Sequence, residues 1–434
     1  MVVPEHVATR LVPERRQDSV QRSAWWQSAA VVCGEIMGTG VLSLPYACAR
    51  LGWVLGIGSS ITFGCTAVYC GLLLSKCKNE LFPDATSFAD LAFYTGGRRF
   101  STFTRGAILT GWACILPYYL VAAASALGSA LPGAGLCQWH WTVVLVVMMA
   151  FPLQLRTLHS ISSLSLVSTF SIVVVLIILV PALLSSQPAV VTTQAGFPGE
   201  QTFLQSSASL GSFVFAYQGQ SCFLEIMREM RVSTEFPKAV FAANGLMMLC
   251  YTTISAIGYG AHGDRITAFL PDALPAGAVR SLVGLLLAYH TLVSYLLTGQ
   301  PLHRALHQMF WPQTCDEFHT REASLHWALV TLSVLGFAFL VANGIPFFSD
   351  FQDLLGNLFG AGTVFGWPAY FFIKGRKLRR QHISPVEWIC CGTFLFVCLP
   401  FFTLIGTLNS ILQIRLDWSK SEAHPFECQA TTPS

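Results

Sequence analysis

Apolar stretches alternate with short polar connections along most of the chain, and each is near the ~20 residues with which a helix crosses a bilayer. Eleven such stretches can be counted. They cover residues 24–47, 53–75, 104–130, 139–155, 160–185, 205–230, 236–260, 278–300, 325–346, 349–373 and 385–412. Long runs of alternating polar and apolar residues, which a transmembrane barrel needs, are absent from the sequence. The pattern predicts an all-α polytopic membrane protein with about eleven transmembrane helices.

The same pattern divides the chain into three parts. A polar tail at 1–23 precedes a transmembrane domain at 24–412, and a short tail at 413–434 follows it. Of the 434 residues, 53% are hydrophobic and 11% are charged, whereas a soluble domain has about a quarter charged residues. No long polar insert interrupts the spans, so we expect the function to lie within the membrane bundle. The lipid bilayer is then its main surrounding, and we expect the protein to work as a monomer.

The positive charges favour one orientation. With the N-terminus in the cytosol, all but five of the 25 Lys and Arg residues lie on the cytosolic side. The exceptions are Arg50, Arg265, Arg280, Arg415 and Lys420. Because Lys and Arg gather in cytosolic connections, this bias predicts a cytosolic N-terminus, eleven spans and a non-cytosolic C-terminus.

The first span contains polar and small residues where an unbroken helix is expected. Its sequence AAVVCGEIMGTGVLSLPY places Glu35 one turn before Gly38, Thr39 and Gly40. One interpretation is close helix packing, which small residues permit. The other is a broken helix, whose two free ends bind a ligand. A carboxyl group deep in a bilayer is costly and marks a functional site, which favours the broken helix.

The sixth span is interrupted in a similar way. It reads SASLGSFVFAYQGQSCFLEIMREM, with four consecutive non-aliphatic residues at 217–220. The alternative is that Gln218 and Gln220 only form hydrogen bonds between helices. Pairing spans 1–5 with spans 6–10 as an inverted repeat places the break at 38–40 opposite the break at 216–220, with span 11 as an addition. We therefore predict that spans 1 and 6 are both discontinuous.

Two of these motifs resemble a known family. GEIMGTGVLSLPYACARLGW is similar to the first-span signature of the amino acid/auxin permease family. FVFAYQGQSCFLEIMREM, followed by FPKAV and IGYGAHG, resembles that family's sixth and seventh spans. The similarity extends from about Ser23 to Asn409 and is strongest in spans 1 and 6. It implies a five-plus-five inverted-repeat fold and the transport of amino acids, driven by protons or sodium.

An amino acid substrate implies two sets of binding groups at the breaks. Backbone N–H groups at the start of the second half-helix of span 1 suit the carboxylate, and carbonyl groups freed in span 6 suit the ammonium. The predicted substrate-binding residues are Gly38, Thr39, Gly40, Val41, Phe215, Ala216, Tyr217, Gln218 and Gly219.

The coupling ion is predicted from the groups beside the first break. Many sodium-coupled relatives have an asparagine there, but this chain has Cys33, Gly34 and Glu35. The absence favours a titratable site, with Glu35 and then His290 as proton-coupling groups; His290 is equally well explained as a core histidine. The sodium alternative would use Ser294 and Thr298, which can also bond their own helix. No other cofactor is expected.

Two further groups of residues, at the cytosolic end of the bundle and within span 3, are also candidates for a functional role. Arg22 is a predicted gate residue at the cytosolic end, and Glu225 is predicted to be either a gate residue or a salt-bridge residue there. In span 3, Trp112, Tyr118 and Tyr119 either form a wall of the substrate pocket or pack as ordinary aromatic residues.

Other function classes find less support in the sequence. HExxH and GxSxG motifs are absent from the sequence, and we expect no pair of intramembrane aspartates. An intramembrane enzyme is therefore not predicted. The cysteines form no CxxC and no set with histidine that is spaced to bind a metal, and no basic footprint for nucleic acid remains beyond the connections. An amino-acid sensor without sustained flux is the main alternative to a transporter. Plasma membrane and vacuolar or lysosomal membrane are both open.

Overall fold

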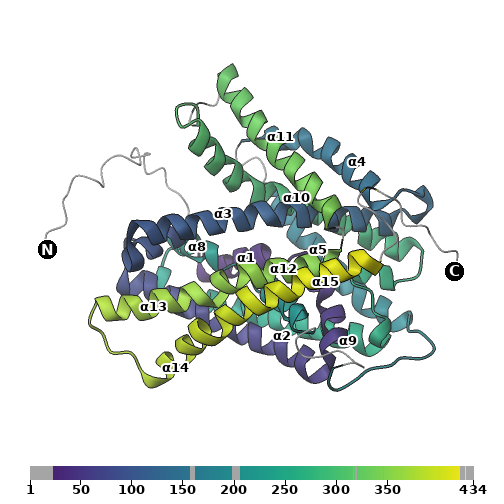
Figure 1. Cartoon of the computed structure of the whole chain (residues 1–434), viewed down its shortest axis with the longest axis horizontal. Coiled ribbons are helices and arrows are strands. Elements are labelled where there is room, and N and C mark those ends of the chain that lie inside the picture. The colour runs from purple at the N-terminus through teal and green to yellow at the C-terminus, as the bar shows by residue number, and fades with distance from the viewer. Residues whose placement is uncertain are drawn as a thin grey trace.

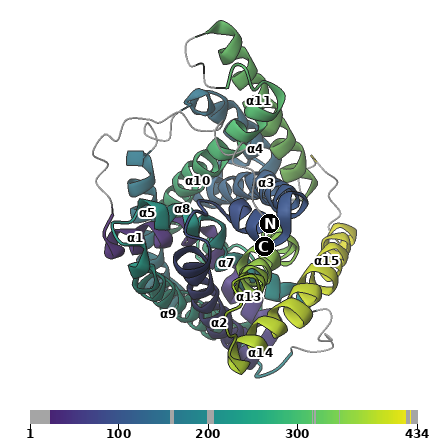
Figure 2. The same cartoon turned by 90° about the vertical axis from the view of Figure 1, so that its left-hand side faces the viewer.

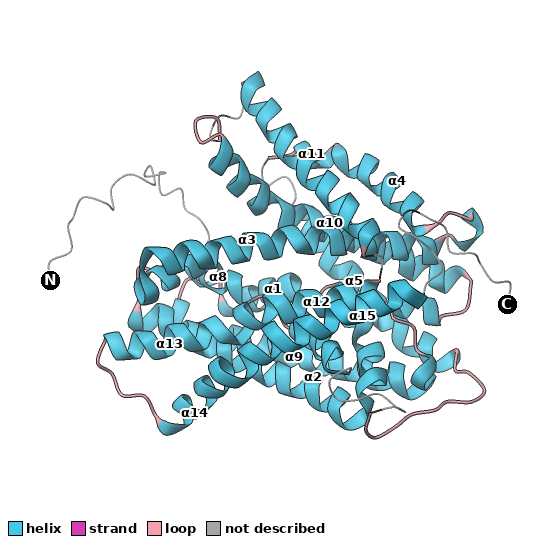
Figure 3. Cartoon of the chain, viewed as in Figure 1, coloured by secondary structure: helices cyan, strands magenta, loops and turns pink. Residues whose placement is uncertain are grey.

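The computed structural model describes residues 23–156, 162–197, 206–315, 317, 320–345, 347–420 and 426. Helices make up nearly all of this part of the chain, and it contains no β-strand (Figure 3). A single parallel bridge joins Ser23 to Met230. The prediction of an all-α membrane protein is therefore confirmed.

The helices overlap the apolar stretches of the sequence, and several extend beyond them. Their bounds are α1 Trp25–Ile36, α2 Leu44–Lys76, α3 Phe88–Ala130, α4 Gln138–Ala150, α5 Ser162–Ser185, α7 Leu210–Ala216, α8 Phe223–Glu229, α9 Phe236–His262, α10 Ala278–Phe310, α11 Arg321–Gly344, α12 Phe348–Leu355, α13 Trp367–Leu378, α14 Pro385–Thr393 and α15 Thr407–Lys420. Seven helical segments in the described ranges are long and apolar enough to cross a membrane. The predicted spans 1, 4, 6 and 10 contain shorter helices instead, so the count of eleven is not established by this criterion.

Both predicted interruptions are present. In span 1, α1 ends at Ile36, Met37 and Gly38 are extended, and a short 3₁₀ turn at Thr39–Ser43 leads into α2. In span 6, α7 ends at Ala216, and a second 3₁₀ turn at Gln220–Cys222 leads into α8. The turn at Thr39–Ser43 packs against α7, so the two breaks lie side by side in the bundle.

Corresponding spans of the two halves pack against each other. Helix α2 packs along α9, and α3 packs along α10, which pairs span 2 with span 7 and span 3 with span 8. Figure 1 shows α3 running across the molecule above α1 and α12, with α2 and α9 below them. Figure 2, turned by 90°, shows α7 near the middle, α4 and α11 on one side and α14 and α15 on another. This arrangement fits the predicted inverted repeat with span 11 outside it.

A glycine makes the turn between spans 1 and 2. Gly52 has a φ angle of 76°, which amino acids other than glycine rarely adopt. In addition, a Cβ atom at this position would lie 2.0 Å from the carbonyl oxygen of Gly196. The two spans therefore join without a loop of several residues. At the other end of the chain, α15 continues to Lys420, eight residues beyond the predicted boundary at 412.

Candidate functional site

A cavity of about 90 Å³ lies where the two breaks meet. Residues of α1, α3, α10 and both interruptions line it. Six of the predicted binding residues are among them: Gly38, Thr39, Gly40, Phe215, Gln218 and Gly219. The predicted coupling residues Glu35 and His290 also line it, as do Ser294 and Thr298 of the sodium alternative. Val41, Ala216 and Tyr217 do not.

The side chain of His290 is anchored on one side and faces the break on the other. Its Nδ1 atom lies 2.9 Å from the hydroxyl oxygen of Ser168, on α5. Its Nε2 atom is buried without a hydrogen-bond partner in the described structure. A Cβ atom added to Gly38 would lie 3.5 Å from this nitrogen. Buried polar atoms normally have a partner, so Nε2 is available to a ligand in the cavity.

Glu35 lines the cavity, and as a whole residue it is exposed, although its neighbours Ile36 and Met37 are buried. Among the described residues it accepts one weak hydrogen bond, from the Sγ atom of Cys222 at 3.7 Å. Within the described ranges, no Lys, Arg or His forms an ion pair with it. A carboxyl group in this position can exchange a proton with water that enters the cavity.

The break in span 6 is stabilised by its own glutamine. The Nε2 atom of Gln220 donates to the carbonyl of Tyr217 at 3.0 Å, and its Oε1 atom accepts from the N–H of Gly219 at 3.0 Å. The carbonyl of Phe215 accepts from the N–H of Gln218 at 3.1 Å. Two of the carbonyls predicted to bind an ammonium therefore already accept one hydrogen bond, and each keeps only its second lone pair for a ligand.

The aromatic residues of span 3 and span 6 divide between the two predicted roles. Trp112 and Tyr119 line the cavity. Tyr118 is fully buried and donates its hydroxyl to Gln352, and Tyr217 donates its hydroxyl to the carbonyl of Ser60 at 3.0 Å. Tyr118 and Tyr217 are thus structural in this conformation.

A buried ion pair connects span 1 with span 10. The Nη1 atom of Arg50 lies 3.1 Å from Oδ1 of Asp350 and 3.8 Å from Oδ2 of Asp353. Asp353 also accepts from the N–H and the hydroxyl of Ser212, at 3.0 and 2.5 Å. Two predictions are wrong here: Arg50 is a buried helical residue rather than part of an outer connection, and span 10 does contain a pair of aspartates.

Gln352 extends this network to the break itself. It accepts a hydrogen bond from the hydroxyl of Tyr118 at 2.8 Å, and its amide donates to the carbonyl of Gly40 at 3.0 Å. Gln352 is fully buried, so these bonds are protected from water. The sequence contained a signal for this set, because SDFQDLLGN is the most polar part of an otherwise apolar span.

Of the two predicted gate residues, Glu225 lies within the described part of the chain. Arg22 lies outside the described residues. Glu225 forms no ion pair with a described residue, and its Oε2 atom is buried without a partner among them, so its role as a gate or salt-bridge residue stays a prediction. Ser23 instead holds the end of α8, where its N–H donates to the carbonyl of Glu229 and its carbonyl accepts from the N–H of Arg231, both at 2.9 Å.

Comparisons with known proteins agree with this geometry. A family described as transmembrane amino acid transporter protein matches residues 21–415. The amino acid transporter ANT1 of Arabidopsis thaliana is 26% identical over 91% of this chain and 93% of its own length. The N amino acid transport system protein of Neurospora crassa is 23% identical over 94% of this chain and 88% of its own. The vesicular inhibitory amino acid transporter of Mus musculus is 25% identical over 80% of this chain and 69% of its own.

Proposed function

Because the chain belongs to the transmembrane amino acid transporter family, we propose that it is a secondary active transporter that carries amino acids across a membrane and couples their movement to protons. The observation that supports the proposal best is the meeting of two interrupted spans at one cavity. Interrupted spans expose backbone N–H and carbonyl groups inside a bilayer, where a zwitterion needs both.

The substrate carboxylate is placed at the start of the second half of span 1. The N–H groups of Thr39 and Gly40 open that helical segment, and the first N–H groups of a helix have no partner within it. The positive end of the helix dipole also favours an anion there. The ammonium group is placed towards the break of span 6, where the second lone pairs of the Phe215 and Tyr217 carbonyls and the amide oxygen of Gln218 are acceptors.

Glu35 is the proposed proton-coupling group. It lies in the cavity wall one turn before the break, and the described structure places no cation against it. When protonated, it is neutral and permits the substrate carboxylate to bind nearby; after it releases the proton, its charge opposes that binding. Loading of proton and substrate is thereby linked. His290, whose Nε2 atom faces the same cavity, is the second candidate.

The test is a pair of transport assays on the full-length protein in liposomes without sodium. Glu35→Gln mimics the protonated state, so it should retain counterflow of a labelled amino acid but lose accumulation driven by a pH gradient. Glu229→Gln, which removes an exposed acid at the end of α8, is the matched control and should retain both. Gradient-driven accumulation by Glu35→Gln would transfer the coupling role to His290.

The sodium-coupled alternative rests on two residues of α10. Ser294 and Thr298 line the same cavity, and Ser294 already donates its hydroxyl to the carbonyl of His290 at 3.0 Å. Uptake by the unmutated protein that requires sodium would favour this alternative. Binding without counterflow would favour the amino-acid sensor.

The proposed orientation places the N-terminus in the cytosol, in a plasma membrane or a vacuolar or lysosomal membrane. Besides the distribution of Lys and Arg, it is supported by Cys137, which lies in the connection between α3 and α4 and forms a disulfide. Disulfides persist outside the reducing cytosol, and the proposed orientation assigns this connection to the other side. We propose further that a monomer is sufficient, because one chain contains both half-sites.

A further inference from the structure

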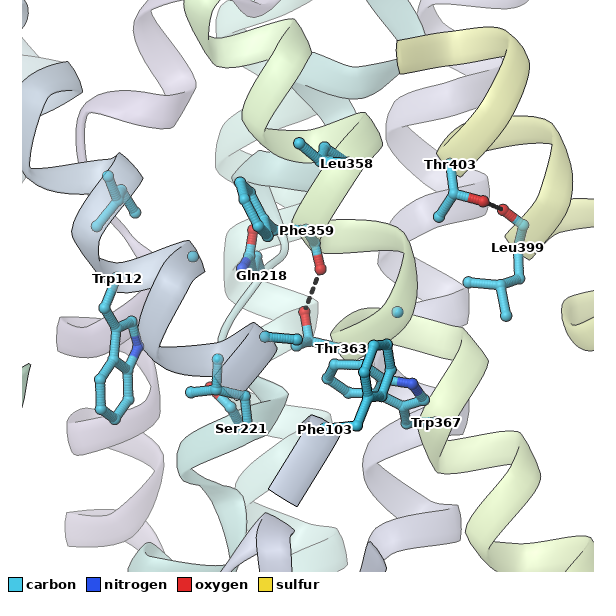
Figure 4. A pocket seen from close by; sticks show the side chains of 15 residues that line it. Phe103, Trp112, Gln218, Ser221, Leu358, Phe359, Thr363, Trp367, Leu399 and Thr403 are labelled. Atoms are coloured by element: carbon cyan, nitrogen blue, oxygen red, sulfur yellow. Dashed lines mark hydrogen bonds between the residues drawn. The ribbon is translucent and has the colours of Figure 1, made fainter. Parts of the chain in front are cut away.

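A second cavity, of about 390 Å³, adjoins the one at the breaks. Its walls come from α3, from the break of span 6, from the segment between α12 and α13 with the first residue of α13, and from the segment between α14 and α15. Four residues line both cavities: Trp112, Ile115, Gln218 and Ser221. In Figure 4, Gln218 and Ser221 lie at the break, across from Trp112 on α3. The two spaces are therefore neighbours that share a wall.

The sizes of the two cavities suit different parts of an amino acid. The cavity at the breaks, at about 90 Å³, accommodates the carboxylate and the ammonium but not a large side chain as well. The second, at about 390 Å³, falls in the range of roughly 300–1,000 Å³ that is usual for small-molecule pockets. A substrate bound between the breaks has this space beside it.

The lining of the larger cavity is apolar in effect. None of the described residues that line it carries a charge. Thr363 donates its hydroxyl to the carbonyl of Phe359 at 3.2 Å, and Thr403 donates to the carbonyl of Leu399 at 2.6 Å (Figure 4). Neither hydroxyl hydrogen remains for a substrate. The other polar groups of the lining are the side chains of Gln218 and Ser221, at the wall shared with the smaller cavity, and the indole N–H groups of Trp112 and Trp367. None of them supplies a countercharge, and a charged group buried without one is costly, so this cavity favours apolar over ionised side chains.

Three helical turns around this cavity are of the wide π type. They are Gly356–Gly360, Gly362–Gly366 and Phe401–Gly406, and they contribute Leu358, Phe359, Gly362, Thr363 and Thr403 to the lining. Such turns are rare and occur often at functional sites, because they replace regular helical hydrogen bonds with a bulge. Two of them belong to span 10 and one to span 11.

We infer that the larger cavity receives the substrate side chain, and that the transported amino acids carry large apolar side chains, aromatic ones included. The inference rests on the proposed function and names its substrate class. Trp112 and Ile115 separate the compartment for the side chain from the compartment for the charged groups, and Phe103 and Trp367, with ring centroids 6.4 Å apart, close part of its wall. Span 11, although outside the repeat, then takes part in substrate selection through Leu399 and Thr403.

The experiment fills the larger cavity from α3. Gly111 lines it, and a Cβ atom there would lie 3.5 Å from the Phe359 ring, which is an ordinary contact. In Gly111→Leu the longer side chain takes up space in the cavity. Gly106→Leu makes the same change on the same helix, at a position that does not line this cavity and where an added Cβ atom meets nothing within 4 Å. It is the matched control.

Counterflow of labelled phenylalanine, leucine, alanine, lysine and glutamate is measured with the full-length protein in liposomes. We expect the unmutated protein to prefer phenylalanine and leucine. In Gly111→Leu, phenylalanine counterflow should fall ~10-fold or more, the usual cost of a steric mismatch in a hydrophobic pocket, while alanine counterflow is retained and shows that the variant is folded. Gly106→Leu should match the unmutated protein.

A graded series, Gly111→Ala, Gly111→Val and Gly111→Leu, extends the test. The inference alone would be overturned if phenylalanine and alanine counterflow fell equally across this series, or if neither fell in any variant, as expected if lipid fills the cavity. Preferred transport of lysine, glutamate or alanine by the unmutated protein would overturn it as well. Failure of the unmutated protein to carry any amino acid would instead overturn the proposed function on which the inference depends.

Discussion

At the scale of single residues, the space between the two breaks depends on Gly38. The backbone there is extended, so alanine fits its dihedral angles, but the new methyl group would stand 3.5 Å from the Nε2 atom of His290. It would occupy the gap between the imidazole and the N–H groups of span 1. The position is thus constrained by the cavity rather than by the backbone.

We therefore expect Gly38→Ala to weaken substrate binding ~10-fold without changing the melting temperature of the purified protein. Gly58→Ala, in α2, where an added Cβ atom meets nothing within 4 Å, is the control and should bind normally. The measurement is the concentration of substrate that half-saturates counterflow. An unchanged value in Gly38→Ala would place the substrate elsewhere.

Gly40 is a less suitable position for the same test. An added Cβ atom would lie 3.2 Å from the Cα atom of Ala216, so the two breaks approach each other through this glycine. Gly40→Leu should abolish transport, but it would also push apart the turn at Thr39–Ser43 and α7. Loss of function in that variant reports on packing as well as on binding.

At the scale of elements, α12 of span 10 connects the second half-helix of span 1 with α7, the first half-helix of span 6. Asp350 and Asp353 bind Arg50 in the first turns of α2, and Asp353 also binds Ser212 on α7. Gln352 binds the carbonyl of Gly40. These bonds are buried and close the bundle on this side of the cavity. A transporter that opens to this side has to exchange them for bonds to water.

Arg50→Met should lower the free energy of unfolding by ~3 kcal/mol or more, because it leaves two buried carboxyl groups without their cation. Arg280→Met is the control. Arg280 pairs with Asp272 at 2.6 Å near the surface, where an ion pair contributes at most ~1 kcal/mol. Chemical denaturation in one detergent compares the two variants.

The double variant with Arg50→Met and Asp350→Asn tests whether charge is the cause. It should recover part of the stability that Arg50→Met loses, since only one unpaired carboxyl group remains. If the double variant is less stable than Arg50→Met, the packing of the arginine side chain, and not its charge, stabilises this region.

At the scale of the whole molecule, the pairing of α2 with α9 and of α3 with α10 builds one bundle from two halves. Each half supplies one break, so neither half contains the cavity by itself. The orientation of this bundle in the membrane determines which side of the cavity the Arg50 network closes. The proposed orientation places it on the non-cytosolic side.

Cysteine labelling checks this orientation in intact cells or sealed vesicles. Val190, 61% exposed in the connection after α5, should label as Val190→Cys with a membrane-impermeant thiol reagent applied from the non-cytosolic side. His382→Cys, in the exposed connection between α13 and α14, should label only after permeabilisation. The parent protein, with its native cysteines, gives the background, and the opposite pattern would invert the proposed topology.

The sequence by itself was sufficient for the all-α membrane class and for the positions of both breaks, and it located most of the helices, though not all of their ends. These features depend on local information: an apolar stretch becomes a helix wherever lipid surrounds it, and GTG or YQG interrupts that helix because small and polar residues replace the aliphatic ones. It was also sufficient for the family, because the motifs of spans 1 and 6 carry the resemblance, and for the expectation that Glu35, Gly38 and His290 lie at one site.

Only the tertiary structure decided which distant groups meet. Arg50 and Asp350 are 300 residues apart in sequence, and nothing in either local sequence predicts their contact. Gln220 was identified as part of the break, but whether its amide binds a ligand or caps its own backbone depends on its rotamer. The larger cavity lies between α3, the break of span 6 and the π turns of spans 10 and 11. Its volume is a property of packing between four segments, and such packing is not encoded in the apolar pattern of any one of them.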